Sequence, residues 1–463
     1  MGLTSILRAF AAMLMIIGVA MTAPLTLAWG LGEAEAGAYL LGAVACLTAG
    51  GAVFASSLGR APPSDFRGVL VVILLWWTAA PAFAALPFVL GGASFADGYF
   101  EAVSAMTTTG AWLSVEDALA SRAGALWRAQ LQWMGGLASV AIAAAIFIRP
   151  AFIGIDTLLP PFARGEKDSF LRPLRNAVTS FAVVYIILTL AAFSAVALAG
   201  APLFDSVIIA MSTVASGGFA PQAEGLAAYE SPVIYAMLPF IVLGGVNFVL
   251  IARIMGGTRE RLRDVETGAY IVIVICVAVL FWVTAGAGDM LRLAPQFFNA
   301  ASLLSTNGFT IGEAPPLIVA MVTAIIGGAA VSTAGGFKIL RWLVIMRRAR
   351  EEIRRLIAPS GVFGQRRVAN ELGVWMHFIV FTMTLAVLVV SLSIGGHGFD
   401  LAAAAATAAL SNTGPLIYLA EGGGEGYAVF SEPLRWLLVA GMILGRLEAA
   451  AALALFNRAF WRF

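Results

Sequence analysis

Long apolar runs alternate with short polar segments along almost the whole chain. A helix needs about 20 apolar residues to cross a bilayer, and many of these runs have that length. The pattern therefore predicts ten transmembrane helices. They are expected near residues 9–29, 36–57, 68–91, 126–148, 176–199, 232–255, 268–287, 315–346, 372–394 and 433–457.

Four shorter apolar segments lie between these runs, at residues 94–108, 202–215, 293–306 and 398–411. Segments of this length are too short to cross a bilayer and too apolar for exposed loops, which favours half-helices that enter the membrane and return. Irregular backbone at membrane depth is tolerated only where it is buried in protein or lines a watery cavity.

Each short segment ends in a turn that contains glycine and small polar residues. The glycines expected at the centre of these turns lie about a hundred residues apart: Gly110, Gly217, Gly308 and Gly414. The chain is therefore predicted to be an all-α polytopic membrane protein with four helix–pore-loop–helix repeats around a pseudo-fourfold pore. The repeats are expected at residues 61–150, 170–260, 265–357 and 370–463, after two extra N-terminal helices in residues 1–60.

Composition supports a membrane protein and gives little support to an enzyme. Of the 463 residues, 60% are hydrophobic and 12% charged, about half the charged fraction of a soluble domain. The two histidines and two cysteines are isolated, so neither a metal site nor a disulfide is expected. Without paired carboxylates or a nucleophile constellation, no enzymatic activity is predicted. Membrane lipid is the expected surrounding, and no nucleic-acid partner is expected.

Basic residues predict the orientation. If the N-terminus is cytoplasmic, most Lys and Arg lie in cytoplasmic segments, with dense groups in residues 149–175 and 347–371. Cytoplasmic loops of membrane proteins carry such an excess of positive charge. Both termini are therefore expected in the cytoplasm, and the four half-helices are expected to enter from outside.

The chemistry of the four turns suits a monovalent cation. A half-helix that ends at such a turn directs the negative end of its dipole inward. Glycine lets the backbone leave helical geometry, so that carbonyl oxygens can replace an ion's hydration shell. The turns contain no ring of acidic side chains, which argues against a divalent cation. The alternative is that each turn only caps a packed helix, but four copies favour a pore.

Several motifs occur in an order typical of one transporter superfamily: TTTGA (107–111), LQWMGG (131–136), STVASGGF (212–219), LGGVNF (243–248), GGAAVSTAGGFK (327–338), SNTGP (411–415) and LGRLE (444–448). With these motifs the chain resembles the Trk/Ktr/HKT potassium transporters, and among them the TrkH branch. The resemblance implies uptake of K+ across the bacterial inner membrane through a filter of backbone carbonyls. The implied filter residues are Thr108, Thr109, Gly110, Ala215, Ser216, Gly217, Thr306, Asn307, Gly308, Asn412, Thr413 and Gly414.

Three filter positions bear on selectivity. Ser216 and Asn307 stand where the family more often has threonine. Family members with serine at the first filter position tend toward sodium, whereas this chain has Gly110 there, which favours potassium.

A polar, glycine-rich segment interrupts the predicted helix of residues 315–346. Its expected gate residues are Gly327, Gly328, Ser332, Thr333, Gly335, Gly336 and, at the cytoplasmic end, Lys338. The spacing of a phosphate-binding loop is absent, whereas close helix packing through small residues is an open alternative. The resemblance implies that this loop is an intramembrane gate below the filter.

Arg446 is the one strongly basic residue expected deep within a predicted span. An ionised group at that depth is costly and usually functional or paired. It is expected to place a positive charge below the filter and to hold the gate loop, with a purely structural pairing as the alternative. By contrast, Arg128 and Gln132 are interpreted as part of an outer-interface anchor, and Asn247 as a helix–helix hydrogen bond.

Partners follow only from the resemblance. It implies a homodimer and a cytosolic, nucleotide-binding regulatory subunit of the TrkA type, since no such domain is recognisable in the chain itself. A secondary transporter that couples a cation to protons or carries an organic solute is the main alternative, although it would usually need a membrane-buried carboxylate on the pathway.

Overall fold

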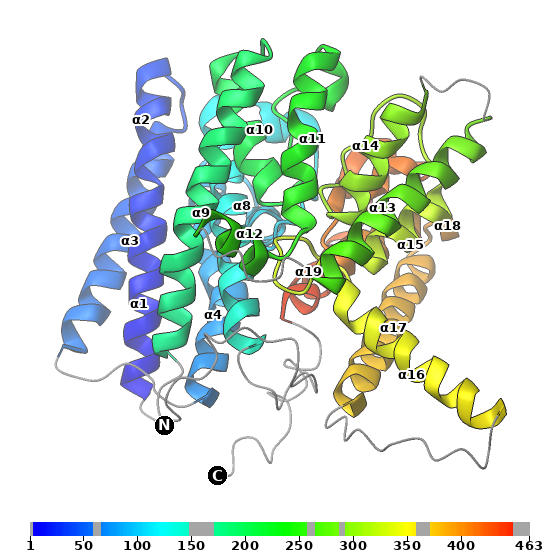
Figure 1. The fold of residues 1–463 in the computed structure, drawn as a ribbon. Helices are drawn as coiled ribbons and strands as arrows, with labels where there is room; N and C mark the ends of the chain where they lie inside the picture. Colours follow the sequence, from blue (N-terminus) through cyan, green and yellow to red (C-terminus); the bar gives the residue numbers. More distant parts are fainter. Residues whose placement is uncertain are drawn as a thin grey trace.

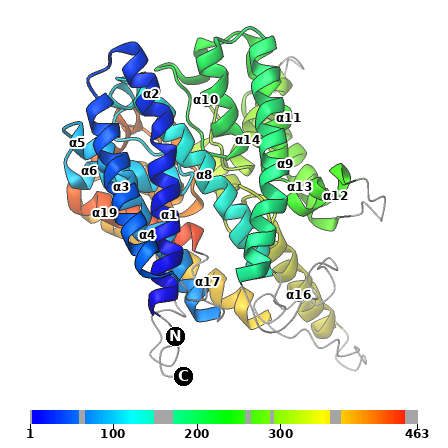
Figure 2. The same ribbon diagram turned by 90° about the vertical axis from the view of Figure 1, so that its left-hand side faces the viewer.

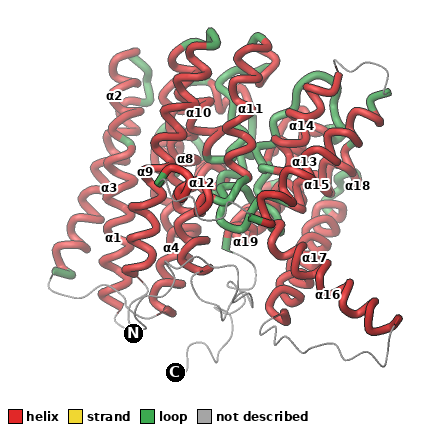
Figure 3. The backbone as a smooth tube through the Cα atoms, in the orientation of Figure 1, coloured by secondary structure: helices red, strands yellow, loops and turns green. Residues whose placement is uncertain are grey.

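A computed structural model describes residues 3–58, 66–147, 171–256, 264–286, 292–357 and 371–447. Within these ranges the chain forms helices and turns and no strand (Figure 3). Helices satisfy their own backbone hydrogen bonds, which a segment inside a bilayer must do. The predicted all-α class is confirmed.

Within the described ranges, six helices are long and apolar enough to cross a membrane, or up to eight if each of two bent pairs counts as one span. The six coincide with predicted spans. The other predicted spans overlap α8 (Arg122–Phe147), the bent pair Ser231–Gly245 and Phe248–Met255, and the short helix Leu317–Ile326 with the loop that follows it. The last overlaps α19 (Glu432–Arg446), and its predicted end at residue 457 lies outside the described residues.

The N-terminal helices form a layer on one side of the molecule, at the left of Figure 1 and facing the viewer in Figure 2. They are α1 (Leu3–Ala20), α2 (Thr22–Leu31) and α3 (Ala36–Ser56). A Cβ added at Gly50 would lie 2.9 Å from the carbonyl oxygen of Ala11, so small residues let α1 and α3 approach closely. This layer packs against α4 and α8 of the first unit.

The rest of the described chain repeats one order four times: a long helix, a short helix, a turn and a further helix. The first unit contains α4 (Phe66–Ala84), α5 (Leu86–Leu90), α6 (Phe95–Met106), α7 (Val115–Leu119) and α8 (Arg122–Phe147). The second contains α9 (Leu171–Leu198), α10 (Leu203–Val214), η3 (Gly225–Ala228), α11 (Ser231–Gly245) and α12 (Phe248–Met255).

The third unit contains α13 (Val265–Thr284), α14 (Leu293–Leu304), α15 (Leu317–Ile326) and α16 (Ile339–Ile357). The fourth contains α17 (Glu371–Ile394), α18 (Phe399–Ser411), η5 (Gly414–Leu419), η6 (Gly423–Val429) and α19 (Glu432–Arg446). The borders expected between repeats, near residues 60, 150–170, 260–265 and 357–370, fall mostly outside the described residues.

The four predicted half-helices are confirmed as helices α6, α10, α14 and α18, within two residues at each end. Ser94 caps α6 by accepting a hydrogen bond from the backbone N–H of Asp97. All four are largely buried, and α18 is buried from Leu401 to Ser411. Their turns meet in the middle of the molecule, where Figure 3 shows loops enclosed by helices.

The prediction of one continuous span over residues 232–255 is wrong. Helices α11 and α12 meet at an angle of 108°. The break follows Gly245, and Asn247 caps α12 by accepting from the N–H of Val249. A side chain at Gly245 would collide with the ring of Tyr270 on α13 (Val265–Thr284), so glycine at this position lets α13 pack closely.

Helix α16 is amphipathic and rich in arginine, and it extends away from the other helices at the end of the molecule where α1 begins (Figure 1). Arg348 and Arg355 pair with Glu352 on its exposed surface. The other parts of the predicted basic loops, residues 149–170 and 358–370, lie outside the described residues.

Candidate functional site

The four turns share an unusual backbone conformation. Each turn has one residue with a positive φ between 54° and 59°, which is the second residue after α6, α10 and α14 and the first after α18: Thr108, Ser216, Thr306 and Asn412. The left-handed region is strongly disfavoured for a β-branched residue such as threonine and costs about 1–3 kcal/mol. Glycine follows two residues later with φ near 70° in the first three turns: Gly110, Gly218 and Gly308. Four copies of a strained turn point to a functional site.

This backbone aligns the second turn one residue later than predicted. The side chain of Ser104 accepts from the N–H of Ala111, and Ser212 accepts from Phe219 at the same spacing. The equivalents of Thr108, Thr109 and Gly110 are therefore Ser216, Gly217 and Gly218. Ala215, predicted as the first residue of this set, instead corresponds to Thr107, because each of these residues still donates a helical hydrogen bond.

The turns meet one another in the interior. The N–H of Gly414 donates to the carbonyl oxygen of Thr109, which joins the fourth turn to the first. A Cβ at Gly110 would collide with the carbonyl of Gly217, and one at Gly218 with the carbonyl of Asn307. A Cβ at Gly308 would lie 3.1 Å from the side chain of Thr413. The structure thus brings all four predicted turns together at fully buried positions.

The chemistry available at this centre is that of neutral oxygens. Each turn carries backbone carbonyls and small hydroxyl or amide side chains. No group of three or more His, Cys, Asp or Glu residues that could hold a metal ion occurs in the described part of the chain. Carbonyl and hydroxyl oxygens without carboxylates suit a partly dehydrated monovalent cation better than a divalent one.

A buried loop between α15 and α16 lies against the broken helix of the second unit. The N–H of Ala329 donates to the carbonyl of Gly245 over 2.9 Å, and the N–H of Phe248 donates to the carbonyl of Val331 over 2.7 Å. The loop contains all the residues predicted for the gate except Arg446, which lies on α19, and its backbone has positive φ at Gly327, Gly336 and Lys338. The bend at residues 246–247 thus leaves the carbonyl of Gly245 and the N–H of Phe248 free of their helical partners, and both are hydrogen bonded to the loop.

The same loop is hydrogen bonded to the turns. Thr333 Oγ1 lies 2.8 Å from Ser216 Oγ, and the N–H of Gly335 donates to Thr306 Oγ1 over 2.7 Å. The N–H of Gly336 donates to the carbonyl of Ser411. The side chains of Ser216 and Thr306, which both have a left-handed backbone, therefore bind the loop directly, so the geometry of the turns and that of the loop are linked.

Arg446 lies where the first turn and the loop meet. Its Nε donates to the carbonyl of Thr107 over 2.5 Å, its Nη1 to the carbonyl of Thr333 over 2.9 Å, and its Nη2 to Thr108 Oγ1. The side chain is buried, with 9% of its surface exposed. A planar guanidinium with donors along both edges can bridge these groups, which an ammonium cannot.

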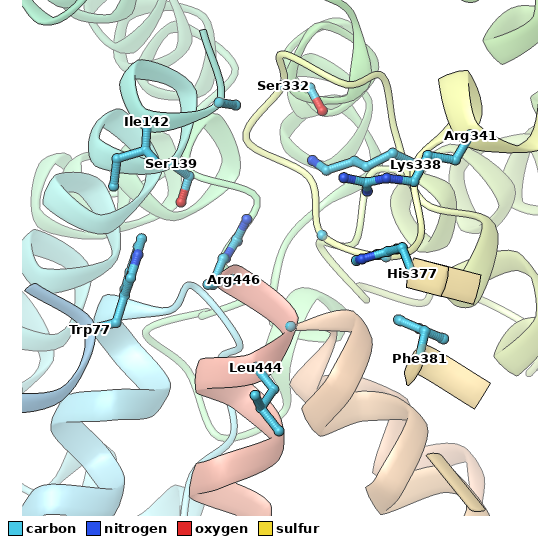
Figure 4. A pocket seen from close by; sticks show the side chains of 14 residues that line it. Trp77, Ser139, Ile142, Ser332, Lys338, Arg341, His377, Phe381, Leu444 and Arg446 are labelled. Carbon is cyan, nitrogen blue, oxygen red and sulfur yellow. The ribbon is translucent and has the colours of Figure 1, made fainter. Parts of the chain in front are cut away.

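A small cavity of about 40 Å³ lies beside Arg446 and has room for a few water molecules. Figure 4 shows Arg446 pointing between α8, which carries Ser139 and Ile142, and the loop, which carries Ser332 and Lys338. His377 and Arg341 line the loop side of the cavity. The Nζ of Lys338 donates to the carbonyl of Ala334, which ties the end of the loop to its middle.

Glu266 is a site residue that the sequence did not reveal. Its Oε1 accepts from the N–H of Ala330 in the loop over 2.6 Å, and Asn247 Nδ2 donates to its Oε2 over 3.4 Å. Asn247 thus makes the predicted bond between helices and also caps α12. In the sequence, a carboxylate in the first turn of an apolar helix is typical of an ordinary helix cap. Its role is therefore evident only once the structure shows the loop next to it.

The predicted outer anchor is instead part of the core. Arg128 forms a buried ion pair with Glu101, 2.8 Å apart, and Glu101 also accepts from the N–H of Leu113 after the first turn. Gln132 is fully buried, and its Nε2 donates to the carbonyl of Gly217 over 2.8 Å. The spacing of residues 128 and 132 places both on one helix face, a signal that could have indicated a shared, inward-facing role.

Comparison with known proteins places this arrangement in a family. A family model described as TrkH, cation transport protein, matches residues 86–267 and 290–461. The chain belongs to this TrkH family. The family comprises transport proteins rather than enzymes, in line with the prediction from composition.

Curated relatives of this TrkH-family chain are similar along most of their length. A Trk system potassium uptake protein TrkH of Salmonella typhimurium is 29% identical and covers 86% of both chains. A Trk system potassium uptake protein TrkI of Halomonas elongata is 32% identical over 85% of this chain and 84% of the relative. The crystal structure of the potassium transporter TrkH from Vibrio parahaemolyticus matches over the full length of both chains, with 26% identity and a TM-score of 0.87.

Proposed function

We propose that this TrkH-family chain takes up K+ across the bacterial inner membrane through a filter made by its four turns. The observation that carries the proposal is the meeting of four buried turns with the same left-handed backbone. Carbonyl rings built in this way can replace the hydration shell of a monovalent ion. The relatives' printed names, which describe potassium uptake, support K+ as that ion.

The proposed filter consists of Thr108–Gly110, Ser216–Gly218, Thr306–Gly308 and Asn412–Gly414. The four units would surround it with pseudo-fourfold symmetry, and the short helices would enter from outside. The two departures from the family pattern expected from the sequence, Ser216 and Asn307, lie in the second and third turns. Because coordination is through backbone carbonyls, these changes are compatible with an intact ion site.

Loop 327–338 is the proposed gate. It would block the path in its present position, since it is hydrogen bonded to Ser216, Thr306 and Ser411 directly beneath the turns. Arg446 would add a positive charge at the same level and hold the loop through the carbonyl of Thr333. Opening would require these bonds to break together, which suits regulation from outside the chain.

Orientation and partners complete the proposal. Both termini would be cytoplasmic, which fits the arginine-rich α16 lying at the end of the molecule where α1 begins. Because the relatives are named as components of a Trk system, a cytosolic nucleotide-binding subunit of the TrkA type is the expected regulator. A homodimer is the expected assembly.

Tracer flux tests the function directly. Purified protein in liposomes is expected to take up 86Rb+, and external K+ is expected to compete more strongly than Na+. Protein-free liposomes provide the background. Equal competition by Na+ would contradict the K+ preference. Absence of uptake, even with a TrkA-type subunit added, would contradict the pore, and uptake only under a proton gradient would indicate coupled transport.

Replacing Glu266 with alanine is expected to loosen the gate loop. The N–H of Ala330 would lose its acceptor, and a buried donor without a partner costs about 1–3 kcal/mol. Basal Rb+ flux should therefore rise about fivefold or more. Glu313→Ala is the matched control, since Glu313 lies in the same unit but its side chain is 56% exposed. Equal flux in the two variants would remove Glu266 from the gate.

A further inference from the structure

In three of the four turns, the side chain of the residue before the filter glycine is hydrogen bonded to the side chain two residues earlier, and we call this bond the brace of the turn. Thr109 Oγ1 lies 2.7 Å from Thr107 Oγ1. In the third turn Asn307 Nδ2 donates to Ser305 Oγ over 3.0 Å. In the fourth, Ser411 Oγ donates to Thr413 Oγ1 over 3.2 Å. Three turns thus carry the same bond between residues two apart, just behind the carbonyls proposed to face the ion.

The second turn cannot form this brace. Its equivalent residues are Ala215 and Gly217, neither of which has a polar side chain. The backbone does not require glycine at Gly217, because its φ is outside the left-handed region, unlike that of Gly218. Space is the constraint: a Cβ at Gly217 would collide with the amide group of Gln132.

Gln132 reaches this turn from α8, which belongs to the first unit. Its side chain is fully buried, and Nε2 donates to the Gly217 carbonyl over 2.8 Å. The amide therefore fills the space of the missing side chain and also holds the carbonyl oxygen. A carbonyl oxygen has two lone pairs, so it can accept this bond and still coordinate an ion.

We propose that Gln132 is a specificity-determining residue that supplies the brace of the second turn in place of that turn's own side chains. The inference rests on the proposed filter. Gln132 acts through the Gly217 carbonyl and is therefore a positioning residue, which keeps this carbonyl at the distance that suits K+. A looser carbonyl would adapt to the smaller Na+, so discrimination would fall.

Simple space filling is the competing explanation, and one atom argues against it. Gln132 Oε1 has no hydrogen-bond partner within the described part of the chain. A buried acceptor without a partner is unfavourable, and an apolar side chain of the same length would fill the space without this cost. The amide is therefore explained by the bond that its Nε2 donates.

Two kinds of variant separate the hydrogen bond from the space. Gln132→Met keeps the length of the side chain and removes the donor. Gly217→Ser alone should collide with Gln132 and lower uptake. Gln132→Ala together with Gly217→Ser removes the collision and places in the turn a hydroxyl that can donate to the carbonyl of residue 215, as Thr413 Oγ1 does to the carbonyl of Ser411. Gln130→Met, on the same helix two residues earlier and half-buried, is the matched control.

The readout is the K+ over Na+ preference in competition with 86Rb+ uptake, with monodisperse elution of each purified variant as evidence of folding. Gln132→Met should lower the preference by about fivefold, the factor that corresponds to one net hydrogen bond. The double variant should recover more uptake and preference than either Gln132→Ala or Gly217→Ser alone, and Gln130→Met should match wild type.

Wild-type preference in folded Gln132→Met would overturn the inference, as would a double variant no better than the better of the two single variants. If the wild-type protein itself did not prefer K+, the proposed filter would fail instead. The two failures are thus distinguishable in one series of measurements.

Discussion

Replacing Arg446 with alanine is expected to raise Rb+ flux by about tenfold or more. The guanidinium lies against the carbonyl of Thr107 at the base of the first turn and against Thr333 in the loop. A unit charge about 4 Å from a permeating cation raises its energy by about 4 kcal/mol at an effective dielectric constant of 20. A third of that repulsion corresponds to tenfold in rate.

Arg446→Lys separates charge from geometry. Lysine keeps the positive charge but cannot bridge Thr107, Thr108 and Thr333 at once. We expect flux between those of wild type and the alanine variant. Arg435→Ala is the control, because Arg435 lies on the same helix and pairs with Asp97 at its other end. Unchanged flux in folded Arg446→Ala would show that Arg446 is only a structural link.

Replacing Gly218 with alanine is expected to reduce uptake at least tenfold. Gly218 has a φ of 69°, which alanine adopts only at a cost of about 1–2 kcal/mol. The larger effect is steric, since the added Cβ would collide with the carbonyl of Asn307 in the next turn. The second and third turns cannot both keep their positions, so the proposed ion site would be distorted.

Gly225→Ala is a closely matched control for this substitution. Gly225 has a similar φ of 62°, but a Cβ there meets nothing within 4 Å. It therefore carries the same backbone cost without the collision, and its uptake should stay near that of wild type. Similar losses in both variants would trace the effect to backbone strain and would count against contact between the turns.

Much of the fold could be read from local pattern. The positions of α6, α10, α14 and α18 follow from apolar segments that are too short to cross a bilayer. The loop between α15 and α16 follows from glycine and small polar residues within an apolar run. Both signals are local properties of composition, which packing with distant residues does not change.

The register of the second turn was not readable in this way. The letters ASGG offer two adjacent glycines, and either could be the equivalent of Gly110. The choice depends on where α10 ends and on the hydrogen bond from the N–H of Phe219 to Ser212. Only the folded backbone shows that Gly218 has the left-handed conformation.

The bend between α11 and α12 was also missed, because residues 232–255 are apolar enough for one continuous span. It is stabilised by partners from the third unit, where the loop accepts and donates hydrogen bonds at Val331 and Ala329. A hydropathy pattern contains no information about such partners.

Local sequence pattern is sufficient for the all-helical class, for the four short helices with their turns, and for the residues from which a loop beneath them could form. Which atoms meet depends on the packing of the units. Gln132 contacts Gly217 across 85 residues, and Arg446 contacts Thr107 across 339. Hydropathy and glycine content act within a single helix or turn, whereas these contacts exist only because separate units pack against one another.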